Sequence, residues 1–96
     1  MVERRLVDTG QRLKQLKADL QVAEEQLAHL SDQAEDARIR SLVSETPLAD
    51  KEHREARKHS ESMQRHKADL LEEIAQVEDQ QNQLLDQLLE GDSATS

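Results

Sequence analysis

Apolar and small residues recur along two stretches of the chain with a spacing built from steps of three and four. The first stretch contains Leu13, Leu16, Leu20, Ala23, Leu27, Leu30, Ala34 and Ala37, and the second contains Ala56, Met63, Leu70, Ile74, Val77, Leu84 and Leu88. This period keeps the side chains on one seam of an α-helix. Each stretch therefore predicts a long helix that packs lengthwise against another helix.

A turn signal separates the two stretches. Thr46 is a good N-cap residue, Pro47 suits the first helical position, and Asp50 in the first turn favours the helix dipole. The sequence predicts an all-α fold in which two long antiparallel helices form a coiled-coil αα-hairpin. The expected elements are a hairpin over 1–91, with helices at about 3–43 and 47–90, a turn at about 44–46, and a disordered tail at 92–96 after a C-cap at Gly91.

Two alternatives remain open at this point. A single helix bent at Pro47 would let two chains exchange halves. The register of the second helix is also open. Pairing residues whose numbers sum to 93 or 94 sets Leu16 against Val77 and turns His59 and His66 inward through a stutter, whereas a strict heptad turns Ser60 and Lys67 inward.

The half of the hairpin near the turn has a poorly filled seam in either register. It relies on small residues such as Ala34, Ala37 and Ala56 together with polar side chains. We expect Leu42, Val43 and Leu48 to close the turn as a small apolar cluster. This half is therefore expected to be the more dynamic one.

Charge alternates in blocks along the chain. Residues 1–18 carry a balance of +3, residues 19–36 of −6, residues 51–67 of +3, and residues 68–96 of −8. Folding back at the proline sets basic blocks beside acidic ones, whereas a parallel pairing sets like beside like. Each exposed pair contributes only about 0.3–0.5 kcal/mol, but many together favour the antiparallel orientation.

Composition narrows the classes of activity. The 96 residues include no Phe, Trp, Tyr or Cys, and 35% are charged, which suits a coiled coil better than a compact globular core. The sequence contains no glycine-rich phosphate loop and no nucleophile elbow, so no enzyme, cofactor or small-molecule substrate is predicted. Asp50 with His53 and Glu55 with His59 have metal-compatible spacing, but neither pair is repeated, and no metal site is predicted.

The net charge of −8 argues against nucleic-acid binding, and no apolar run is long enough to cross a membrane. We therefore expect a cytoplasmic, non-enzymatic coiled-coil protein that acts as a protein–protein interaction or scaffold/adaptor module. The alternative is a transcription-associated or nucleoid-associated regulator that acts through the hairpin tip or the basic block 51–67.

Two surfaces are candidates for binding. Glu45, Leu48 and Asp50 lie together near the turn and predict a partner-binding tip. Four leucines near the other end, Leu84, Leu85, Leu88 and Leu89, are denser than scattered surface residues and predict self-association. The simplest assembly of this kind is a homodimeric four-helix bundle.

Overall fold

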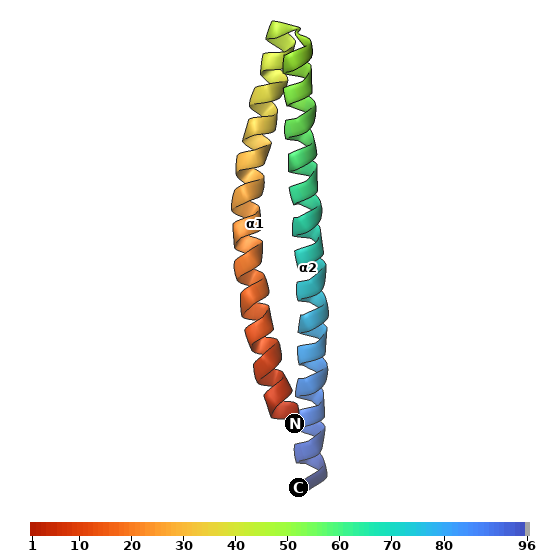
Figure 1. Ribbon diagram of the computed structural model, residues 1–96. Helices are drawn as coiled ribbons and strands as arrows, with labels where there is room; N and C mark the ends of the chain where they lie inside the picture. Colours follow the sequence, from red (N-terminus) through yellow and green to blue (C-terminus); the bar gives the residue numbers. More distant parts are fainter. Residues whose placement is uncertain (96) are drawn as a thin grey trace. The chain divides into compact units, whose positions relative to one another are not determined.

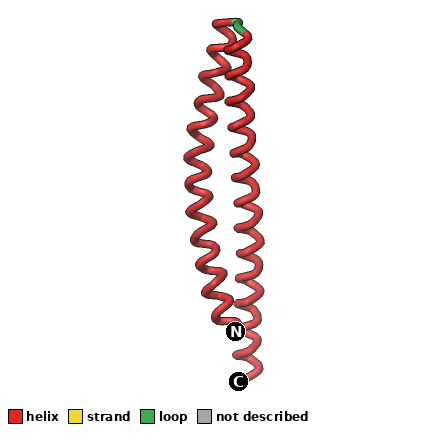
Figure 2. Tube along the Cα trace, in the orientation of Figure 1, coloured by secondary structure: helices red, strands yellow, loops and turns green. Residues whose placement is uncertain are grey.

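The computed structural model describes the backbone of residues 1–95 and the side chains of residues 1–91. Helix α1 spans Val2–Ser44 and helix α2 spans Pro47–Thr95, and Glu45 and Thr46 alone connect them (Figure 2). The prediction of an all-α hairpin formed by two long helices of one chain is confirmed. Neither helix, over the part of the chain that is described, has a segment long and apolar enough to cross a membrane.

The turn is stabilised by a cap on each helix. At the start of α2 the Ala49 N–H donates to Thr46 Oγ1 at 3.2 Å, so Thr46 is the N-cap and Pro47 the first helical residue, as the sequence predicts. At the end of α1 the Glu45 N–H donates to the Ser41 carbonyl at 3.2 Å, and Glu45 has a φ of 50°. This left-handed residue ends α1 because its backbone turns away from the helix axis.

The C-terminal end of α2 differs from the expected boundary. Gly91 does not have the positive φ of a left-handed C-cap, and the helix continues to Thr95. Glycine permits a left-handed termination but does not impose one. The disordered tail at 92–96 stays a prediction, and its last residue, Ser96, lies outside the described residues.

The chain divides into two compact units. The first, which we call the terminal unit, combines Met1–Leu20 with the chain from Leu70 onward. In Figure 1 its red stretch of α1 lies beside the blue stretch of α2. The residues buried in its seam are all large and aliphatic: Leu13, Leu16, Leu70, Ile74, Val77 and Leu84. Hydrophobic burial of these side chains is the main stabilising contribution in this unit.

The second unit, which we call the turn unit, is Gln21–Asp69. Here the yellow stretch of α1 lies beside the green stretch of α2 in Figure 1. The side chains buried in its seam are all small: Ala23, Ala37, Ala49 and Ser60. Larger side chains such as Leu27, Leu30 and Met63 are only half-buried. The expected poor filling near the turn is confirmed.

The structure decides the register of α2. Ser60 is buried and Lys67 half-buried, whereas His59 and His66 are exposed, so the heptad is strict and the stutter is wrong. The Ser31 and Ser60 hydroxyl oxygens lie 3.4 Å apart across the seam. Their numbers sum to 91 instead of the expected 93 or 94, because the connection is only two residues long and is centred before Pro47.

Candidate functional site

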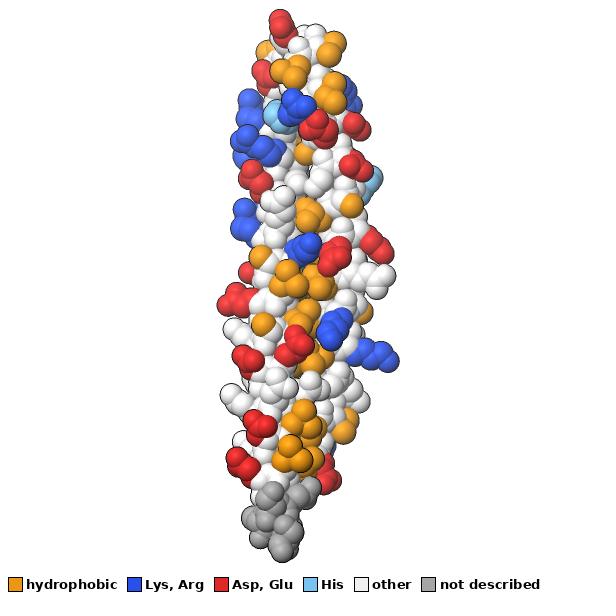
Figure 3. Space-filling model, turned by 180° about the vertical axis from the view of Figure 1, so that it is seen from behind, with side chains coloured by type: hydrophobic (Ala, Val, Ile, Leu, Met, Phe, Trp, Pro, Cys, Tyr) orange, Lys and Arg blue, Asp and Glu red, His pale blue; other side chains and the backbone are white. Residues whose placement is uncertain are grey.

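The turn exposes several large apolar side chains. Leu42, Val43 and Leu48 are 64%, 80% and 65% exposed, and Ile39 is also exposed. Ile39, Leu42 and Val43 are spaced by three and four residues, so they share one outward face of the last turns of α1. We call these four residues the tip patch. Figure 3 shows hydrophobic side chains gathered at the turn, at the top of the view.

The expectation that Leu42, Val43 and Leu48 close the turn is wrong. The buried residue at the start of α2 is Ala49, which takes the seam position that continues the heptad of Ser60. Because successive residues differ in direction by about 100° around a helix, burial of Ala49 turns its neighbour Leu48 outward. The heptad phase therefore gives the inner position to the smaller side chain and leaves the leucine in water.

Acidic side chains flank the tip patch. Glu45 and Asp50 are both exposed, so all three residues predicted for the tip, Glu45, Leu48 and Asp50, are accessible. The left-handed backbone of Glu45 costs roughly 1–2 kcal/mol for a residue other than glycine. Strain of this kind is found at functional sites more often than elsewhere.

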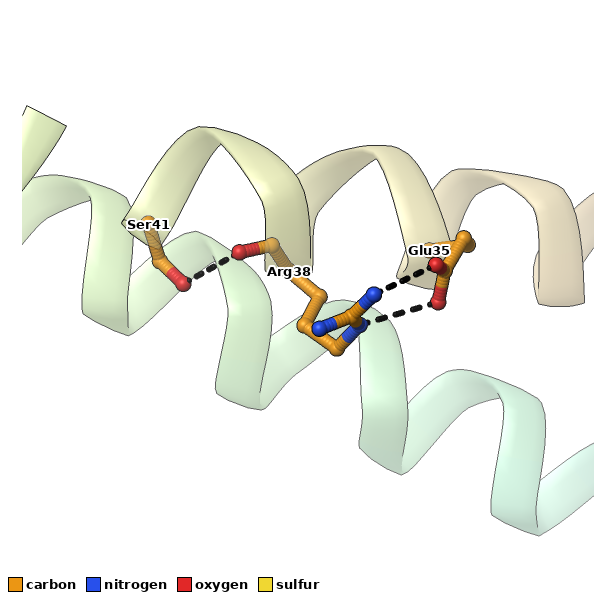
Figure 4. A network of polar contacts seen from close by, with 3 residues as sticks. All are labelled: Glu35, Arg38 and Ser41. Atoms are coloured by element: carbon orange, nitrogen blue, oxygen red, sulfur yellow. Dashed lines mark hydrogen bonds and ion pairs between the residues drawn. The ribbon is translucent and has the colours of Figure 1, made fainter. Parts of the chain in front are cut away.

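A polar network reinforces α1 just before the tip patch. The Arg38 guanidinium donates two hydrogen bonds to Glu35, from Nε at 3.0 Å and from Nη2 at 2.7 Å (Figure 4). The Ser41 hydroxyl donates to the Arg38 carbonyl at 2.7 Å. The hydrogen bonds from Arg38 and its positive charge lower the pKa of Glu35, and His53 on α2 adds a smaller attraction. All of these contacts join residues three apart in the chain and lie within α1.

The four leucines predicted for self-association do not form one surface. Leu84 is buried in the seam of the terminal unit and Leu88 is half-buried there. Leu85 and Leu89 are 42% and 63% exposed and lie outside the seam. The sequence groups the four because they are close along the chain, but a helix directs adjacent residues to different sides.

The charge blocks make different contacts in the two units. In the terminal unit Arg12 of α1 forms an ion pair with Glu73 of α2, as the antiparallel arrangement predicts. In the turn unit the ion pairs among the described residues lie within single helices, and they join Glu35 to Arg38, Lys51 to Glu55, and Arg57 to Glu61. Two members of the basic block 51–67, Lys51 and Arg57, are thus paired within α2.

No group of three or more potential metal ligands comes together among the described residues. The tip patch is the site that sequence reasoning found only in part, since Ile39 was missed and Leu42 and Val43 were expected to be covered. Extending the heptad spacing of the buried seam residues across the turn would have shown that these side chains face outward.

Comparison of the chain with protein-family models, with curated proteins and with solved structures gave no match.

Proposed function

We propose that this protein is a non-enzymatic interaction module that binds a partner protein through the tip patch. The observation that carries the proposal is the exposure of Leu42, Val43 and Leu48 beside a two-residue turn. Exposure of apolar side chains to water is unfavourable, and covering them with another surface lowers the free energy. The capping hydrogen bonds at the turn define where α1 ends and α2 begins, and so where these side chains are presented.

The partner that fits is a protein with an apolar groove whose rim donates hydrogen bonds to carboxylates. The leucines and the valine would enter the groove, and the exposed carboxylates of Glu45 and Asp50 would meet polar or basic groups at its edge. Apolar contacts in the centre with charges at the rim are the usual arrangement of such interfaces.

Site-specific photo-crosslinking tests this proposal. A photoreactive residue in place of Val43 should capture one defined protein in cells, and the same residue in place of the exposed Val22 should not. The captured protein, once purified, should bind the wild-type chain directly. The variant L42S/V43S/L48S should bind it at least about tenfold more weakly while keeping its helical content. Equal capture at both positions, or unchanged binding by the triple variant, would overturn the tip as the binding surface.

A substitution at Glu45 separates binding from folding. Glu45→Gly relieves the left-handed strain and should raise the thermal stability, because glycine adopts this backbone without a clash. If the Glu45 carboxylate contacts the partner, the same variant should bind it more weakly although it is more stable. A variant that binds as tightly as the wild type would remove Glu45 from the interface and leave the apolar residues as the contact.

A further inference from the structure

The helix pair of the terminal unit has two unlike flanks. One flank is polar: it contains the Arg12–Glu73 ion pair and a shallow hollow lined in part by Arg5, Gln80 and Gln87. Glu73, Gln80 and Gln87 are spaced by seven residues and therefore share one side of α2. Polar side chains on a surface form hydrogen bonds with water, so this flank needs no partner.

The other flank carries exposed apolar side chains, together with Glu78 midway between Leu71 and Leu85. Leu71 and Leu85 each follow a buried seam residue, are fourteen residues apart, and are exposed, as is Leu89 four residues further on. On α1 the exposed Val7 lies two residues after Arg5, which places it off the polar flank. We call this surface the leucine flank. Figure 3 shows hydrophobic side chains on one face of the molecule in the lower part of the view.

Charge is divided between the two helices of the terminal unit. Over residues 70–91, α2 carries six acidic residues and no basic one. Over residues 1–20, α1 carries five basic residues against three acidic ones. On this flank Lys14 lies seven residues after Val7 on α1, and Glu78 lies seven residues from both Leu71 and Leu85 on α2. The leucine flank therefore has an acidic side chain along α2 and a basic one along α1. A surface with one acidic and one basic edge is complementary to a copy of itself when each edge meets the opposite edge.

Only one of the two simple dimer symmetries satisfies this condition. A two-fold axis parallel to the helices sets α1 of one copy against α2 of the other, antiparallel, with basic edges on acidic edges. A two-fold axis perpendicular to the helices sets the acidic α2 stretches against each other, and like charges in contact are destabilising. Charge therefore selects the parallel axis.

We propose that the leucine flank binds a second copy of this chain about a two-fold axis parallel to the helices. The terminal units of the two copies form a four-helix bundle in which Val7, Leu71, Leu85 and Leu89 of both copies become core residues. The basic stretch of α1 in each copy packs beside the acidic stretch of α2 in the other. This interface is separate from the tip patch and does not depend on the function proposed for it.

Oligomeric state, measured by sedimentation at micromolar concentration, tests the interface. The wild type should be a dimer. The variant L85E/L89E should dimerise at least about tenfold more weakly, because each glutamate adds a charge to the apolar surface. Q80E/Q87E on the polar flank introduces the same number of charges on the same helix and should remain dimeric. A monomeric wild type, a dimer that persists in L85E/L89E, or equal loss in both variants would overturn the proposal.

Disulfide trapping tests the symmetry without disturbing the fold, because the chain contains no cysteine. Two single-cysteine variants, V7C and L85C, are mixed and oxidised. The parallel axis brings position 7 of one copy near position 85 of the other, so the mixture should form mainly the mixed disulfide. Crosslinking that is as efficient in either variant alone as in the mixture would exclude this arrangement.

Discussion

The terminal unit and the turn unit follow the same heptad but fill it with different side chains. Leucine, isoleucine and valine occupy the buried positions of the terminal unit, and alanine and serine occupy those of the turn unit. Burial of a large aliphatic side chain contributes about 1.5–3 kcal/mol, and alanine contributes far less. The difference teaches that one heptad pattern can be filled by large side chains in one unit and by small ones in another, and we expect the stability to be concentrated in the terminal unit.

The tip patch and the leucine flank differ in the same way, because the seam beneath each is filled differently. In the turn unit large apolar residues are exposed around the turn while small ones fill the seam, so apolar surface is available to a partner. In the terminal unit the seam is already filled, and the leucine flank is additional apolar surface. We therefore expect the terminal unit to hold the chain together and the turn unit to carry recognition.

The largest expected effect comes from the best-packed residue of the terminal unit. Leu16 is 1% exposed, and Leu16→Ala should lower the free energy of unfolding by about 2–5 kcal/mol, because it removes buried methyl groups and leaves a cavity. Urea denaturation followed by circular dichroism measures this change. Val22→Ala, at an exposed position of the turn unit, should change it by less than about 0.5 kcal/mol. Similar losses in the two variants would contradict the stabilising role of Leu16 burial in the seam.

Hydrogen exchange compares the two units directly. Amides of residues 34–59 should exchange at least about tenfold faster than those of residues 13–20 and 70–81, because fewer large side chains resist local opening near the turn. A tenfold ratio corresponds to about 1.4 kcal/mol. Mass spectrometry of peptic fragments reports both regions in one experiment. Equal rates would mean that the chain opens as one cooperative unit.

A larger side chain in the seam of the turn unit should reduce the difference in stability between the two units. Ser60→Leu adds an aliphatic side chain at a buried heptad position and should raise the stability by about 1 kcal/mol. The Ser31 hydroxyl loses a weak contact, but Ser31 is exposed enough to bind water. Ser62→Leu, at an exposed position two residues away, is the control and should give no gain. A loss of stability in Ser60→Leu would show that the serine pair is required for packing.

The smallest expected effect concerns the network before the tip patch. Arg38→Gln should raise the pKa of Glu35, because the wild-type pKa is lowered by hydrogen bonds and attraction from Arg38. A lowered folded-state pKa contributes stability that is present above the unfolded pKa and is lost as the pH falls through the folded value. The variant should therefore lose stability at neutral pH and differ little from the wild type in acid. Carboxyl chemical shifts followed by NMR measure the pKa, and an unchanged titration would contradict the network.

Local signals in the sequence were sufficient to predict the two helices and the position of the turn. The two apolar periods predicted both helices, and Thr46 and Pro47 placed the start of α2 at the correct residue. Such signals act over one or two helical turns, where capping and side-chain period are determined by neighbours in the chain. Gly91 is the exception, because a residue that permits a helix end does not require one.

Register and exposure were decided by tertiary structure. The sequence alone did not show whether His66 or Lys67 faces the seam of α2. Both residues are polar, and a polar residue has too weak a preference for a buried position to determine the rotation of the helix where no apolar residue marks the seam. The buried Ser60 and the exposed His59 and His66 show the phase that the tertiary structure adopts.

The amino-acid sequence by itself determined that this protein forms two helices, where they begin, and that they pair in antiparallel fashion, because period, caps and charge blocks are properties of the chain. Only the tertiary structure decided that Ala49 lies inside while Leu42, Val43 and Leu48 remain in water, and that Leu84 and Leu85 face different surroundings. The physical reason is that burial depends on the rotation of one helix relative to the other. A shift of the buried face by one residue changes which side chains meet.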